Sequence, residues 1–415
     1  MIVALRTSIT APSLIYRLLF IIAIFLPLFF KGNKIWLPCV ITFVTVSINS
    51  FAFGYLPYEV SVYAVLSFIA LVILKYITPK TIIQIKPLYF ALILYVFLVN
   101  FINSGNPQNI FWCISTIAIS SYLVEKNIYV NRFYMLNAFA IISFILSILY
   151  LFNYQAFLDS YSVSDDIERA GWTDPNYLSC IVGMGLMSAL ILLLGKCAKS
   201  TYIKLFWICV IIVSFMSQVL MASRGGILCT SMSVIFLILS IRVKVRHKVI
   251  FILTICCFLA FLYHQNYFEL FAYRMENDSL DSGRMEIWNM KLSKFFTDGN
   301  IFSWLFGIGY ENAFKLSNTS QAIGFHNDFL AIFCGYGIIG LFFFLYLIFI
   351  HPCLNVQCSD RPILFSLIIY LFFASSTLEP LASGNITFWA FYYLILLFTG
   401  RNKVVNKMGQ QTVTH

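Results

Sequence analysis

Residues 220–230, LMASRGGILCT, place one arginine and two glycines between two apolar runs. The whole apolar stretch, 203–241, is longer than the roughly 20 residues of one membrane span, so we expect the chain to turn at SRGG. Gly225 and Gly226 would allow that turn, because glycine accepts positive φ without steric penalty. A guanidinium held at the membrane surface suits bidentate binding of a phosphate. The alternative is that Arg224 only extends to the lipid headgroups.

A second polar group stands in RAGWTDPNYLSC, residues 169–180. Asp174 and Pro175 are the residue types expected at the N-cap and first position of a helix, so their role can be purely structural. The helix start also has free backbone N–H groups that can bind an anion. Together with Asn176 and Arg169, it is a candidate anion contact.

A third polar group stands directly before the apolar run that starts at residue 328. His326 and Asn327 occupy this junction, where the imidazole can change its protonation near neutral pH. A cap or a simple interfacial role is the alternative for the histidine. In a further segment, 281–296, apolar residues recur at helical spacing and predict a short amphipathic helix. Arg284 lies in its first turn, and Lys291 and Lys294 are among its polar positions.

An imidazole beside several arginines at a membrane surface suits transfer from a lipid diphosphate. Fixed cations stabilise the departing diphosphate, while a base removes the proton of the attacking hydroxyl. A metal held by paired carboxylates would be the other electrophilic device, but the outer loops contain no Asp-x-Asp, only Asp278 and Asp281. We therefore expect an arginine-assisted transfer with neither metal nor cofactor.

The elements that position these residues are predicted to be membrane-spanning helices. The chain is 60% hydrophobic and 11% charged, with 43 Phe and 24 Tyr, which is too apolar for a soluble domain of this length. Its eleven Cys, most of them inside apolar runs, do not form a disulfide framework. We predict one all-α polytopic membrane domain, 1–415, with 12 or 13 transmembrane helices. The predicted spans are 13–31, 35–53, 59–77, 85–102, 108–124, 133–152, 176–195, 203–222, 226–241, 248–264, 328–350, 362–378 and 386–399.

Basic residues in the breaks between spans predict the orientation. One set of breaks carries 16 Lys and Arg against only Glu125 and Asp360, and this set is expected on the cytoplasmic side, together with the C-terminus. The net charge of +10 therefore reflects topology and does not indicate nucleic-acid binding. Two outer loops are long, 153–175 and 265–327, and the latter contains the amphipathic helix at 283–296. This helix lies either along the bilayer surface or on the bundle, closing the loop. Binding residues are often carried on such loops.

Five short motifs in order resemble the O-antigen polymerase and O-antigen ligase superfamily of bacterial envelope proteins. The motif-bearing part is 168–345, and the first 150 residues carry no signature. The motifs are DPN at 174–176, SRGG at 223–226, SGRMEIW at 282–288, GIGYEN at 307–312 and HNDFLAIFCGYGIIGL at 326–341.

The resemblance implies an inverting, metal-independent membrane glycosyltransferase with a bundle similar to the glycosyltransferase type C fold. It would use glycans linked to undecaprenyl diphosphate at the periplasmic side of the inner membrane. His326 resembles the family's histidine beside the acceptor and is the candidate base. Arg224 and Arg284 resemble its diphosphate-binding arginines. The remaining candidate substrate-binding residues are Arg169, Arg274, Asn176, Asn327, Ser223 and Asp174.

Within the superfamily, a polymerase joins one lipid-linked repeat unit to another, whereas a ligase moves the finished chain to lipid A core. The aromatic N-terminal 150 residues and the modest outer loops favour the polymerase. A flippase for the same lipid is less favoured, because its charges would lie near the bilayer midplane. A membrane scaffold would leave the clustered arginines without a cause. The expected partners are the lipid-linked oligosaccharide and the bilayer, with a polysaccharide chain-length regulator as a further candidate.

Overall fold

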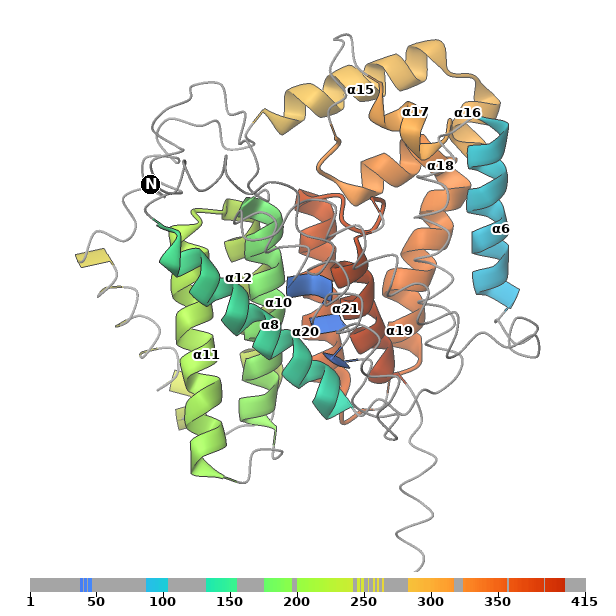
Figure 1. Ribbon diagram of the computed structural model, residues 1–415. Helices are drawn as coiled ribbons and strands as arrows, with labels where there is room; N and C mark the ends of the chain where they lie inside the picture. Colours follow the sequence, from blue (N-terminus) through green and yellow to red (C-terminus); the bar gives the residue numbers. More distant parts are fainter. Residues whose placement is uncertain are drawn as a thin grey trace, which may run out of the picture.

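The computed structural model describes eight continuous stretches of the chain, together with scattered positions within 38–46 and 245–264 (Figure 1). All regular structure in the described residues is helical. Four of these helices are long and apolar enough to cross a membrane. The predicted spans 13–31, 35–53, 59–77, 108–124 and 248–264 lie wholly or largely outside the described residues, so the total of 12 or 13 stays a prediction. The continuous stretches are 87–103, 132–154, 175–195, 200–241, 283–316, 324–356, 358–383 and 385–399.

The other predicted spans agree with the helices of the structure to about two residues at each end. The long helices are α6 (Pro87–Ile102), α8 (Arg132–Phe152), α10 (Pro175–Leu194), α11 (Thr201–Leu220), α12 (Arg224–Ser240), α18 (Asp328–Leu345), α20 (Arg361–Thr377) and α21 (Ile386–Leu397). Short helices complete the described part: α15 (Arg284–Asp298), α16 (Ile301–Phe306), α17 (Tyr310–Phe314), the π-helix η2 (Tyr346–Ile350) and α19 (His351–Leu354).

Helix α10 lies at the centre of the bundle and packs against α8, α11, α12, α20 and α21. Several of its polar neighbours form hydrogen bonds within the bundle, as a lipid environment favours. Gln218 of α11 donates from Nε2 to the carbonyl of Ser179 at 2.7 Å and to Oγ1 of Thr230 at 2.9 Å. Tyr370 of α20 donates to the carbonyl of Cys180 at 2.5 Å. These bonds fix the register of α10 against its neighbours.

The helix ends gather in two groups, one at each end of the bundle. At one end, Arg132 bridges to Asp360 at 2.5 Å and donates to the carbonyl of Leu397 at 2.9 Å, which joins the starts of α8 and α20 to the end of α21. At the other, Tyr150 near the end of α8 donates to the carbonyl of Leu220 at the end of α11, at 3.1 Å. This alternation agrees with the topology predicted from the basic residues, in which Arg132 and Asp360 are cytoplasmic.

The turn between α11 and α12 differs from the prediction. Ala222, with φ 48°, adopts the left-handed conformation, whereas Gly225 and Gly226 lie in the first turn of α12. Ser223 caps that helix, accepting from the N–H of Gly226 at 3.2 Å. Gly226 is needed for close packing, since a Cβ there would lie 2.1 Å from Oγ of Ser179. The glycine therefore lets α12 approach α10 and does not shape the turn.

Gly226→Ala is expected to lower the thermal stability of the detergent-solubilised protein, because the added methyl overlaps α10. Overpacking of this kind costs about 1–3 kcal/mol. Gly225→Ala is the matched control: its Cβ would lie 3.1 Å from Oγ1 of Thr377, a contact that a small shift relieves. Equal melting temperatures for the two variants would contradict this account of Gly226.

Helix α18 is broken at Gly337, within the predicted span 328–350, although the helical stretch as a whole, Asp328–Leu354, is long and apolar enough to cross a membrane. Gly337 has φ 66° and ψ −174°, and a Cβ there would lie 2.2 Å from the carbonyl oxygen of Leu305. The outer loop pairs with the backbone just before this break, where the N–H of Gly309 donates to the carbonyl of Gly335 at 2.8 Å. Tyr95 of α6 donates to the carbonyl of Tyr336 at 2.6 Å. The loop and α6 thus satisfy carbonyls that the break exposes.

The amphipathic helix predicted at 283–296 is confirmed as α15. It contacts α18, and Figure 1 shows it lying across the end of the bundle at which α18 begins. Phe295 is buried, and Trp288 and Leu292 pack against the core. Lys291, expected among the polar positions, is instead fully buried. These contacts fit the alternative in which the helix closes the loop onto the bundle.

Candidate functional site

The predicted base and its neighbour lie on the short segment 324–327 that leads into α18. His326 is partly exposed and has φ 50°, a left-handed backbone that few non-glycine residues adopt. Asn327 caps α18: its Oδ1 accepts from the N–H of Leu330 at 3.1 Å, and its Nδ2 donates to the carbonyl of Ser376 at 3.2 Å. Asn327 therefore has a structural role whatever else it binds.

The structure brings two predicted residues from separate stretches into direct contact. Ser223, before α12, donates from Oγ to Oδ1 of Asn176 in the first turn of α10, at 2.9 Å. Ser223 is fully buried, whereas Asn176 and Arg224 are partly exposed. This bond places the starts of α10 and α12 side by side, with Arg224 directly after the buried serine.

The last turn of α20 connects the Arg224 turn to the His326 segment. Thr377 lies against Gly225, the residue that follows Arg224. Its neighbour Ser376 accepts the side-chain hydrogen bond of Asn327, the residue that follows His326. The Arg224 turn and the His326 segment, far apart in the sequence, are thus held at one end of the bundle by adjacent residues of α20.

Arg284, the first residue of α15, stands near the same segment. One turn later, Trp288 donates from Nε1 to the carbonyl of Phe325 at 2.7 Å. Residues four apart share a face of a helix, so Arg284 lies on the face that α15 turns toward Phe325. The predicted first helical position of Pro175 is also confirmed. Three further candidates, Arg169, Asp174 and Arg274, lie outside the described residues.

Three buried charged residues beneath this segment were not singled out as site residues from the sequence. Asp328 is fully buried and accepts from the backbone N–H groups of Leu381 at 3.1 Å and Ala382 at 2.8 Å. Glu379 accepts from the N–H of Phe325 at 3.0 Å, and Lys291 is the third of the group. For Glu379, the feature of the sequence that could have revealed it is a glutamate followed by proline in the break between the last two predicted spans.

Lys291 and Glu379 are both shifted toward their neutral forms. Burial lowers the pKa of Lys291 to about 8, against an opposing effect of the negative charge of Glu379. Burial likewise raises the pKa of Glu379 to about 7, opposed by the Phe325 N–H and by the charge of Lys291. Nζ of Lys291 donates to the carbonyls of Ala313 at 3.2 Å and Phe314 at 2.7 Å, which ties the outer loop to this group.

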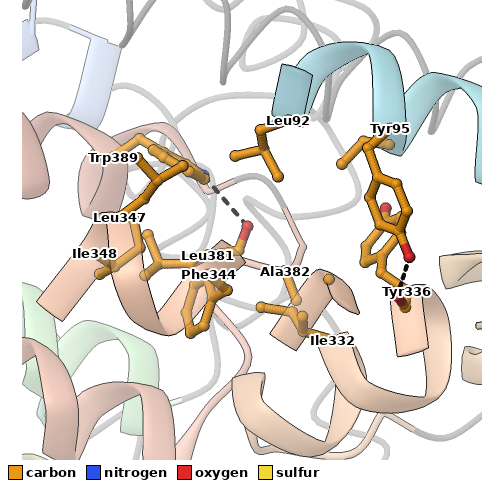
Figure 2. A pocket seen from close by; sticks show the side chains of 12 residues that line it. Leu92, Tyr95, Ile332, Tyr336, Phe344, Leu347, Ile348, Leu381, Ala382 and Trp389 are labelled. Carbon is orange, nitrogen blue, oxygen red and sulfur yellow. Dashed lines mark hydrogen bonds between the residues drawn. The ribbon is translucent and has the colours of Figure 1, made fainter. Parts of the chain in front are cut away.

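An apolar cavity of about 50 Å³ lies beside the loop between α20 and α21, and is lined as well by α6, α18 and α21. Figure 2 shows Trp389 and Leu381 on one side of it and Tyr95 and Tyr336 on the other. Trp389 donates from Nε1 to the carbonyl of Leu381 at 3.3 Å, which helps to close the wall. A lining of this kind suits hydrocarbon better than a sugar.

The arrangement combines partly exposed cations and an imidazole at one end of an apolar bundle. Such an end can bind an anionic headgroup while the attached lipid stays in the bilayer. Residues 208–345 match the O-antigen ligase family, and this stretch, about a third of the chain, includes Arg224, Arg284 and His326. Neither a curated protein nor a solved structure matches the chain.

Proposed function

We propose, from the O-antigen ligase family domain that the chain carries at residues 208–345, that this multi-pass bacterial membrane protein is an O-antigen polymerase. It would transfer an undecaprenyl-diphosphate-linked glycan chain to the non-reducing end of another lipid-linked repeat unit. The observation that carries the proposal is the meeting of the Arg224 turn and the His326 segment across the end of α20. The reaction takes place at the periplasmic face of the inner membrane, with the C-terminus in the cytoplasm.

In this proposal, Arg224 and Arg284 bind the diphosphate of the donor. His326 takes the proton of the acceptor hydroxyl, whose oxygen attacks the anomeric carbon as the bond to the undecaprenyl diphosphate breaks. Attack from the side opposite the leaving group inverts the anomeric configuration. The cations stabilise the charge that develops on the diphosphate, so the step proceeds without a metal. Arg169, Arg274 and Asn176 are further candidates for donor binding.

O-antigen ligase is the second candidate function, favoured by the description of the matching family. The polymerase remains our choice because of the strongly aromatic first 150 residues and the modest outer loops. A flippase would need a polar path through the bundle, whereas the cavity between α6, α18 and α21 is apolar.

Deletion of the gene is expected to leave single repeat units on lipid A core, because ligation continues when polymerisation is lost. Silver-stained gels of the surface polysaccharide and mass spectrometry of the carrier lipid provide the measurement. Long chains that accumulate unattached on the carrier would identify a ligase instead. Repeat units retained on the cytoplasmic side would indicate a flippase, and a wild-type ladder would refute all three.

A further inference from the structure

The segment that carries His326 is wrapped around one buried carboxylate, that of Glu379. This residue lies in the loop between α20 and α21 and is 5% exposed. One carboxylate oxygen accepts from the N–H of Phe325 at 3.0 Å. The other lies against Gly324, where a Cβ would be only 2.3 Å from Oε1. The absence of a side chain at Gly324 therefore lets the segment close on the carboxylate.

These contacts hold the peptide units on both sides of Phe325. The N–H of Phe325 donates to the Glu379 carboxylate, and the backbone N–H of His326 also stabilises the charge of that carboxylate. The carbonyl of Phe325 accepts from Trp288 at 2.7 Å. His326 itself has φ 50°, and a residue in this unfavourable conformation persists only where its surroundings fix it. The Glu379 carboxylate thus interacts with two consecutive backbone N–H groups at this turn.

The charges around the carboxylate suit this role. Lys291 lies beneath the segment, with Nζ 4.5 Å from the centroid of the Phe325 ring, and its charge acts on Glu379. Asp328 is the other buried carboxylate of the group, and it is bound by the backbone of Leu381 and Ala382. Lys291 and Glu379 thus contact the His326 segment from α15 and from the loop after α20, while Asp328 binds that loop.

We infer that Glu379 is a positioning residue, whose buried carboxylate holds the left-handed backbone of His326 and so places the imidazole for its part in the transfer. The inference rests on the proposed function of His326. It assigns to the loop between α20 and α21, which lies outside the stretch that matches the family, a direct part in shaping the site. Glu379 itself touches no reacting atom.

The first test measures the conformation of His326 without using activity. The purified full-length protein is treated with diethyl pyrocarbonate, and the modification rate of each histidine is followed by mass spectrometry. Glu379→Gln is expected to change the rate at His326 several-fold, because an amide has one acceptor oxygen for the two N–H groups. His264, an exposed histidine outside the His326 segment, serves as the internal reference. An unchanged rate at His326 would overturn the inference.

The second test measures the kinetics of Glu379→Gln and Glu379→Asp, with Glu286→Gln as the matched control. Glu286 is an exposed glutamate of α15 that the proposed mechanism does not use. We expect kcat to fall at least tenfold in Glu379→Gln, with KM for the lipid-linked donor unchanged, and to recover partly in Glu379→Asp. We also expect the acid limb of the pH profile to move in Glu379→Gln, since the titrating carboxylate is gone. Equal kinetics in Glu379→Gln and Glu286→Gln would overturn the inference.

Two further outcomes separate the inference from the proposed function. If Glu379→Gln fails to give a monodisperse protein in size-exclusion chromatography, Lys291→Met takes its place. It leaves the carboxyl group in position but removes the facing cation, so the pKa of Glu379 rises and its protonated form is a weaker acceptor for the segment. It too is expected to change the modification rate at His326, and no change would count against the inference. If the rate changes while His326→Ala still polymerises, Glu379 positions the segment but the proposed role of His326 is wrong.

Discussion

His326→Ala is expected to abolish polymer formation while the protein remains folded and inserted in the membrane. A general base that acts in the transition state contributes about 10²–10⁴-fold to the rate, and His326 is the only one of the five histidines predicted directly before an apolar helix on the outer side. The measurement is the length distribution of the surface polysaccharide in a complemented deletion strain, with protein levels followed by immunoblot. A normal ladder would refute the proposed role.

His326→Asn is the control that separates chemistry from backbone geometry. Asparagine tolerates the left-handed conformation better than alanine does, so this variant should keep the turn at φ 50° but lack a titratable base. We expect it to be as inactive as His326→Ala and as stable as the wild type. An active His326→Asn variant would show that the turn, and not the imidazole, is what the reaction needs.

Arg224→Lys is expected to lower kcat/KM by about 10- to 100-fold. This corresponds to the roughly 1.5–3 kcal/mol of a hydrogen bond to a charged group, because the ammonium keeps the charge but loses the planar pair of donors. Arg224→Ala should lower it further, since the charge is lost as well. The measurement is the conversion of purified lipid-linked oligosaccharide in detergent or proteoliposomes.

Arg246→Lys is the matched control for this change, because Arg246 is exposed and predicted to be cytoplasmic. Its activity should equal that of the wild type. Full activity in Arg224→Lys would support the alternative in which this arginine only reaches the headgroups. A loss in both variants would point to an effect on insertion, which immunoblots of membrane fractions would reveal.

The sequence predicted the parts of the site that depend on local pattern. The apolar run that starts at residue 328 located α18, and the amphipathic spacing after Arg284 located α15. It also predicted that Ser223 and Asn176 would lie at one end of the bundle, where they form a hydrogen bond. Their position at the same end follows from topology alone, since alternate breaks between membrane spans face the same side of the membrane.

The local pattern misassigned residues whose roles depend on distant partners. Lys291 has the polar type and spacing of a surface position on α15, yet it is fully buried under Phe325. Gly226 has the pattern of a turn residue, yet its role is to admit Ser179 of another helix. In both cases the deciding contact comes from residues more than 30 positions away along the chain.

By itself, the sequence determined the class of the protein, where the long described helices begin and end to about two residues, and which breaks share a side. These properties follow from hydropathy, because the bilayer fixes the length of an apolar span and the polarity of its ends. The tertiary structure decided that α18 breaks at Gly337, that Gly324 closes on the carboxylate of Glu379, and that the last turn of α20 joins Arg224 to His326. Such contacts depend on which helix faces are packed together, and hydropathy is nearly uniform around helices that are apolar on all sides.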